Sequence, residues 1–180
     1  RDGTVTGVQT CALPIFLTDE RERMVMEQQL IVKICKVGSA AKDREEIRIP
    51  LYATPGAAGA DLFACLEQDV IIKPGERAKI PTGVAMEIPD NLVGLVFARS
   101  GLASNKGLTL CNGVGVIDSD YRGEIMVPVI NLGSQNVIVQ DGERIAQIVF
   151  INIFKASFKE VEYLDMTLRG DGGFGSTGEK

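Results

Sequence analysis

The 180-residue chain contains no histidine. Its absence excludes Ser-His and Cys-His nucleophile pairs and every metal site that is built on histidine. If the protein is an enzyme, its general base must be an aspartate, a glutamate, a lysine or a tyrosine with a shifted pKa. The sequence also lacks an apolar run of the roughly 18 residues that a membrane-spanning helix requires. We therefore expect no membrane partner.

Basic side chains are too few to predict a surface for long nucleic acid. The chain has 19 Lys and Arg against 24 Asp and Glu, and its formal net charge is −5. Its four cysteines lie far apart without a CxxC pair, at Cys11, Cys35, Cys65 and Cys111. This spacing fits reduced thiols in a cytoplasmic protein better than a zinc site or a disulfide framework.

Composition divides the chain into three regions. Residues 1–15 show no clean period and resemble the conceptual translation of a sequencing adapter, so we expect residues 1–23 to be a non-native extension that ends before Met24 or Met26. Residues 24–165 are expected to form one β domain. Residues 166–180 are rich in glycine and polar side chains, which is typical of a flexible arm.

Short stretches rich in Val and Ile dominate the middle region, and Gly and Pro turn signals separate them. This pattern predicts an all-β sandwich or barrel. One or two helical turns are expected near Leu102–Lys106, and residues 38–46 are expected to form a polar loop. Strands are expected within residues 29–37, 83–89, 91–98, 124–132, 136–140 and 144–154.

A pair of aspartates stands in the stretch GVIDSDYRGEI, residues 115–125. It is not an EF-hand loop, because Arg122 and Val129 occupy positions where such a loop needs a polar ligand and a glutamate. Two interpretations stay open. The stretch is either a β-turn with solvated acids, or it carries a carboxylate base, Asp118 or Asp120, beside an aromatic ring, Tyr121, that packs on a sugar or a base.

Further polar residues stand at the ends of apolar stretches. Arg99, Ser100 and Gly101 follow one such stretch, where they make either an anion site at a helix start or a helix cap with a surface arginine. Asp61 follows small residues that allow either close approach of a ligand or a tight loop. Gln147 stands in an otherwise apolar strand and needs a polar partner.

The C-terminal stretch GDGGFGSTG, residues 170–178, offers backbone N–H groups and two hydroxyls that suit phosphate binding. It is not a P-loop, because it has no lysine at the required place.

Five stretches together carry a family resemblance: AGADL, ARSGLA, NGVGVIDSDYRGEI, GERIAQIVF and RGDGGFGSTG. In order and spacing they resemble the five motifs of the trimeric dUTP pyrophosphatases (dUTPases), from about residue 47 to residue 178. The resemblance implies a distorted β jelly-roll that assembles as a homotrimer with an exchanged C-terminal arm and three sites between subunits. It also implies hydrolysis of dUTP to dUMP and pyrophosphate with Mg²⁺, which limits uracil in DNA and supplies dUMP.

The resemblance also implies roles for single residues. Asp118 would be the base that activates water, and Tyr121 would stack under the deoxyribose. Asp61 and Gln147 would complete the catalytic set, with Asp61 supporting the shell of water around a metal that no side chain binds directly. The expected substrate-binding residues are Arg99, Ser100, Gly101, Asn112, Gly113, Val114, Val116 and Tyr121, with Arg169, Phe174, Gly175, Ser176 and Thr177 from a neighbouring arm.

Two other functions are compatible with the same fold. One is deamination of dCTP, which needs a differently built hairpin for reading the base. The other is a nucleotide-sensing regulator without catalysis, because a fold alone does not determine a function.

Overall fold

The computed structural model of the chain describes residues 30–42 and 47–173. The expected extension, residues 1–23, and the last part of the expected arm, residues 174–180, lie outside the described residues.

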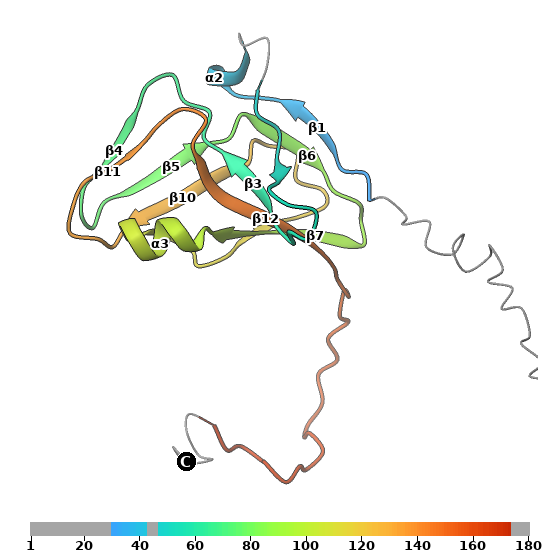
Figure 1. The fold of residues 1–180 in the computed structure, drawn as a ribbon. Helices are drawn as coiled ribbons and strands as arrows, with labels where there is room; N and C mark the ends of the chain where they lie inside the picture. Colours follow the sequence, from blue (N-terminus) through green and yellow to red (C-terminus); the bar gives the residue numbers. More distant parts are fainter. Residues whose placement is uncertain (1–29, 43–46, 174–180) are drawn as a thin grey trace, which may run out of the picture.

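Strands make up most of the regular structure, which confirms the predicted all-β class (Figure 1). Every predicted strand segment contains a strand. The described helices are the short α2 (Ser39–Lys42) and α3 (Ser100–Lys106). The strands are β1 (Lys33–Lys36), β2 (Leu51–Tyr52), β3 (Ala60–Phe63), β4 (Val70–Ile72), β5 (Arg77–Pro81), β6 (Val84–Glu87), β7 (Leu92–Ala98), β8 (Leu108–Leu110), β9 (Gly115–Ile117), β10 (Met126–Asn131), β11 (Val137–Val139) and β12 (Arg144–Asn152).

The described strands pair in antiparallel sheets that combine segments distant in sequence. The largest sheet has the order β2-β3-β12-β7-β9, and the others are β5-β10-β8, β11-β4 and β1-β6. In the last of these, Lys33 lies opposite Glu87, and its ammonium donates to the Glu87 carboxylate at 3.0 Å. That hydrogen bond, with the charge of Lys33, lowers the pKa of the exposed Glu87.

One hydrophobic core joins all of these sheets. Leu62 of β3, Ile80 of β5, Val84 of β6, Val127 of β10 and Val139 of β11 are all at most 1% exposed and belong to the same cluster of buried side chains. Because each sheet contributes to this single core, the strands form one folded unit, and functional side chains stand at the ends and edges of its strands.

Two segments refine the sequence-based picture. The prediction of a loop over residues 38–46 is wrong at its start, because α2 occupies Ser39–Lys42. Alanine favours a helix, and Ala41 is completely buried there. After β12 the chain leaves the folded unit (Figure 1), and Phe154, Phe158 and Met166 are at least 97% exposed. The described segment 153–173 contains no helix or strand.

Candidate active site

Neighbouring strands bring three of the predicted motifs together. Gln147 of β12 lies opposite Asp61 of β3 on one side and opposite Phe97 of β7 on the other. The residues at and beyond this end of β7 complete a hollow of about 380 Å³. The lining of this polar hollow consists of Ala53, Ala57, Ala58, Gly59, Asp61, Arg99, Ser100, Gly101, Arg144, Gln147 and Val149.

A nearly buried carboxylate organises the polar hollow. One oxygen of Asp61 lies 2.9 Å from Nε of Arg99, and the other lies 3.1 Å from Nη1 of Arg144. Arg99 also donates to the backbone carbonyl of Arg144 at 3.2 Å. The Asp61 side chain is 10% exposed, whereas those of Arg99 and Arg144 are 27% and 48% exposed. The cluster therefore presents a net positive charge to the hollow, and that charge suits a polyanion.

Arg144 is a residue whose part in this cluster the sequence-based assignment missed. It begins β12, where alternation alone places it on a surface. No strand pattern could have found it, because residues three apart in a regular strand point to opposite faces, and the irregularity of β12 between Arg144 and Ala146 interrupts that alternation.

Gln147 is half-buried at the wall of the polar hollow. Its amide donates to the carbonyl of Ala98 at 3.5 Å, which is a long hydrogen bond. Gly59 provides the space for this side chain, because a Cβ at position 59 would lie 3.1 Å from Oε1 of Gln147. The partner that the sequence predicts for Gln147 is therefore a backbone carbonyl of the neighbouring strand.

The predicted anion site lies at the start of α3. Arg99 is the N-cap residue, and its side chain makes no capping hydrogen bond because a guanidinium has no acceptor for the helix N–H groups. It is instead paired with Asp61. Ser100 and Gly101 are exposed at the first turn. Both interpretations of this segment, an anion site and a helix cap with a surface arginine, stay predictions.

The predicted base-reading residues lie on an open sheet edge. β9 is the last strand of its sheet and pairs with β7, so the backbone groups on its other side have no strand partner among the described residues. Gly113 has a positive φ of 70°, which forms the turn before this strand. Val114 and Val116 are 39% and 60% exposed. A flat ligand can therefore contact both the backbone edge and two apolar side chains.

Asp118 follows this strand at the end remote from the turn. The N–H of Tyr121 donates to the Asp118 carbonyl at 3.2 Å, so the predicted β-turn is present. Asp118 and Asp120 are exposed and line a second hollow of about 420 Å³. We call it the acidic hollow, and it is lined by Asp90, Leu92, Val93, Asp118, Ser119, Asp120, Ile153 and Lys155. The turn conformation and a catalytic carboxylate are compatible.

Tyr121 is held by its own loop. Its hydroxyl donates to the backbone carbonyl of Glu124 at 2.9 Å. The residue as a whole is 43% exposed. Arg122 fixes the same loop by donating to the carbonyls of Ser119 and Tyr121 at 2.6 Å and 3.0 Å. The aromatic ring is thus positioned without a ligand.

The acidic hollow and the polar hollow lie at opposite ends of β7. Ile117 of β9 is paired with Gly94, so Asp118 is placed beside Val93, whereas Arg99 follows the other end of β7. Six residues of extended strand separate these two points by about 20 Å, at about 3.3 Å per residue. No residue lines both hollows. Within one copy, Asp118 and Arg99 therefore line different hollows.

The predicted arm residues are only partly described. Arg169 donates from Nε to the carbonyl of Gly172 at 2.8 Å, which is a contact within the arm itself. Phe174, Gly175, Ser176 and Thr177 lie outside the described residues. Their roles stay predictions.

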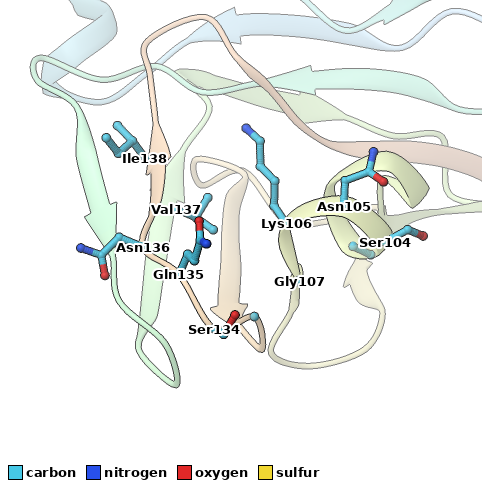
Figure 2. Close-up of a pocket in the computed structure, with 11 residues that line it drawn as sticks. Ser104, Asn105, Lys106, Gly107, Ser134, Gln135, Asn136, Val137 and Ile138 are labelled. Atoms are coloured by element: carbon cyan, nitrogen blue, oxygen red, sulfur yellow. The ribbon is translucent and has the colours of Figure 1, made fainter.

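A third hollow is larger, at about 650 Å³, and lies beside the end of α3. Figure 2 shows Ser104, Asn105 and Lys106 on one side of it and the segment from Ser134 to Ile138 on the other. None of its lining residues belongs to the predicted site. Lys106 is paired with Glu143 at 3.1 Å, so this hollow presents no cluster of acid, base and phosphate-binding groups.

The described residues contain no group of three or more Cys, Asp or Glu side chains that could hold a metal ion by themselves. Both oxygens of Asp61 already accept from arginines. A divalent cation bound near these hollows would need ligands from a substrate and from water, which is the coordination that Mg²⁺ favours. Among the described helices, none combines the length and the apolar character needed to cross a bilayer.

The sequence matches the family model described as dUTPase over residues 45–178. The chain is 59% identical over 144 residues to the deoxyuridine 5'-triphosphate nucleotidohydrolase of Desulfitobacterium hafniense (strain DSM 10664 / DCB-2), covering 79% of this chain and 95% of that protein. It is 50% identical over 139 residues to the protein of the same name from Hydrogenobaculum sp. (strain Y04AAS1), covering 77% and 96%.

A likeness to solved structures extends the match to three dimensions. A mutant of the Staphylococcus bacteriophage 80alpha dUTPase, solved with dUpNHpp, superposes with a TM-score of 0.70 at 27% identity. The match covers 82% of this chain and 98% of that one. The jelly-roll class that the motifs implied is thereby confirmed for the subunit.

The ion pairs of Asp61 lead to a prediction about stability. We expect Asp61→Asn to lower the free energy of unfolding by about 1–3 kcal/mol, because an uncharged amide leaves two adjacent arginines without their shared carboxylate. Urea denaturation of the variant and the wild type measures this. Glu87→Gln is the control: it breaks the exposed pair with Lys33 and should change little. An unchanged midpoint for Asp61→Asn would contradict the role given to this acid.

Proposed function

The chain belongs to the dUTPase family, and from this membership we propose that it hydrolyses dUTP to dUMP and pyrophosphate, as a dUTP diphosphatase. The reaction removes dUTP before uracil enters DNA and supplies dUMP for the synthesis of dTMP. Identity of 59% over most of both chains supports the assignment. Support from the structure comes from the open edge of β9 and from the two hollows at the ends of β7.

The separation of Asp118 from Arg99 is the observation that carries the mechanism. Under the assignments above, the base lies along the Asn112 turn and β9, and the sugar lies beside Asp118. The phosphates then continue beyond Asp118, away from the Arg99 of the same copy. A second copy must supply the polar hollow, so each site forms between subunits. In a closed ring of identical contacts, as in a homotrimer, every site receives both of its halves.

Recognition of the base and sugar uses the edge of β9. The edge of β9 that faces away from β7, the backbone carbonyls of the turn at Gly113 and Val114, and the Asn112 amide offer donors and acceptors to the edge of uracil. Tyr121 provides a flat apolar surface for the deoxyribose. A ring packed against the deoxyribose leaves no room for a 2′-hydroxyl. The site therefore selects a deoxyribonucleotide.

Cleavage needs a base, an oriented water and neutralised charge. The Asp118 carboxylate accepts a proton from a water molecule, and the water oxygen forms the new bond to the α-phosphorus. The bond from the α-phosphorus to its bridging oxygen breaks, and pyrophosphate leaves. Arg99, Ser100 and Gly101 of the neighbouring copy hold the departing phosphates, with Gln147 beside them. When bound, Mg²⁺ would supply positive charge to the same phosphates, and none of the described side chains is proposed to bind it directly.

Asp61 contributes through the arginines rather than through a free oxygen. Its two ion pairs hold Arg99 and Arg144, one each, at the polar hollow. We expect Asp61 to support the shell of water around the metal indirectly, through these arginines, with no direct bond from protein to metal.

The segment after β12 suits contact with another subunit. It presents Phe154, Phe158 and Met166 to solvent, and such an apolar series is more typical of an interface than of a free surface. We place Arg169, Phe174, Gly175, Ser176 and Thr177 over the substrate of a neighbouring site, where closure excludes bulk water. Exposed, unbridged thiols at Cys35 and Cys111 and a nucleotide substrate suit the cytoplasm.

Product analysis tests the proposed reaction. The purified chain is incubated with Mg²⁺ and, in turn, dUTP, UTP, dTTP or dCTP, and the phosphate products and ammonia are measured. We expect dUMP and pyrophosphate from dUTP and little turnover of the other three. Ammonia from dCTP would instead indicate a deaminase, and binding of dUTP without products would indicate a regulator.

A single substitution tests the base. We expect Asp118→Asn to retain dUTP binding and to lower kcat by about three orders of magnitude or more, because the amide cannot accept the proton from water. The matched control is Asp120→Asn, which changes an equally exposed acid of the same turn. It should retain most of the activity. A kcat of Asp118→Asn close to that of the wild type would remove Asp118 from this role.

A further inference from the structure

We propose that Gly123 is a specificity-determining residue, because its lack of a side chain provides the space in which Tyr121 is fixed against the sugar. The inference rests on the proposed function, in which Tyr121 selects the deoxyribose. Gly123 itself touches no substrate in this account and acts by positioning the ring.

The first observation is the anchoring of the Tyr121 hydroxyl. It donates to the carbonyl of Glu124 at 2.9 Å, so the phenol turns back over its own loop. Glu124 is fixed in turn, since its carboxylate accepts from the N–H of Gly83 at 2.8 Å. Next to it, the N–H of Ile125 donates to the carbonyl of Val84 at 2.9 Å. The acceptor of the Tyr121 hydroxyl is thus attached to the core strands.

The second observation is the space at position 123. A Cβ built on Gly123 would overlap the hydroxyl oxygen of Tyr121, and it would lie 2.6 Å from Cζ and 3.0 Å from Cε2 of the same ring. Real Cβ atoms do not approach other atoms so closely, so the ring would have to move. The backbone of Gly123 is not in the left-handed region. Space, rather than backbone freedom, therefore makes glycine necessary here.

Displacement of the Tyr121 ring affects the selection between dUTP and UTP more than it affects the turnover of dUTP. dUTP and UTP differ by one hydroxyl, and a site distinguishes them only when a side chain occupies a defined position against the sugar. If the ring leaves its anchored position, the exclusion of the 2′-hydroxyl weakens, whereas Asp118 and the polar hollow are unchanged. Selection between the two sugars should respond more strongly than turnover of dUTP.

The test compares kcat/KM for dUTP and UTP in the wild type and in Gly123→Ala. We expect the ratio of the two values to fall about tenfold or more, in line with the effect of small misplacements in active sites. Gly56→Ala is the matched control, because a Cβ there has no heavy atom within 4 Å and φ is not left-handed. It should keep the wild-type ratio. A folded Gly123→Ala protein with an unchanged ratio would overturn the proposal.

Tyr121→Phe provides a second test that does not depend on the folding of Gly123→Ala. It retains the ring and removes the hydroxyl that is both the anchor and the nearest atom to the added Cβ. Alone, it should lower the dUTP to UTP ratio by about two- to fivefold. Combined with Gly123→Ala, it should give a higher ratio than Gly123→Ala alone, because the overlap is reduced.

Equal ratios in the wild type and Tyr121→Phe would contradict the anchoring step, whatever the behaviour of Gly123→Ala. Failure of the proposed function is a different result: the wild type would then release no dUMP from dUTP. Circular dichroism and gel filtration of each variant confirm that folding and assembly are retained.

Discussion

The carboxylate of Asp61 is the constraint on which the arrangement of the polar hollow depends. Two arginines, one after β7 and one at the start of β12, would repel each other in the same hollow. A nearly buried acid between them holds both guanidinium groups in place, and the cluster keeps one positive charge in excess. The strand order β3-β12-β7 brings Asp61, Arg144 and Arg99 into this contact. Under the proposed function, the phosphate-binding groups would thereby be in place before any substrate arrives.

The same sheet also separates the groups that the reaction needs. β9 lies at its edge and carries the base-reading turn at one end and Asp118 at the other. Arg99 lies beyond the opposite end of β7 from Asp118, about 20 Å away by strand length. Under the proposed function, a chain that holds both halves of a site at such a distance would be active only as an assembly. Oligomerisation would then be part of the proposed chemistry.

Much of this could be predicted from the sequence, and the exceptions have physical reasons. Helix α3 and the strands β1, β6, β7, β10, β11 and β12 follow from local patterns of Val, Ile, Gly and Pro and were predicted. The strands β2, β3, β4, β5, β8 and β9 have at most five residues each, too few for a clear local pattern, and were not predicted. α2 was missed because the burial of Ala41 is a tertiary effect. Arg144 was missed because alternation indicates only a surface. The space at Gly123 depends on where Tyr121 turns, which no local pattern reveals. The placement of the arm residues from 174 onward stays a prediction.

Complementation between inactive subunits tests the central claim most directly. Asp118→Asn and Arg99→Ala chains are mixed in equal amounts, unfolded and refolded together, and assayed for pyrophosphate release from dUTP. If each site takes Asp118 from one copy and Arg99 from another, random assembly in a closed ring leaves about one quarter of the sites intact. Activity near that fraction of the wild type is expected. Activity no higher than that of either variant refolded alone would show that both residues act within one copy, and it would contradict the account.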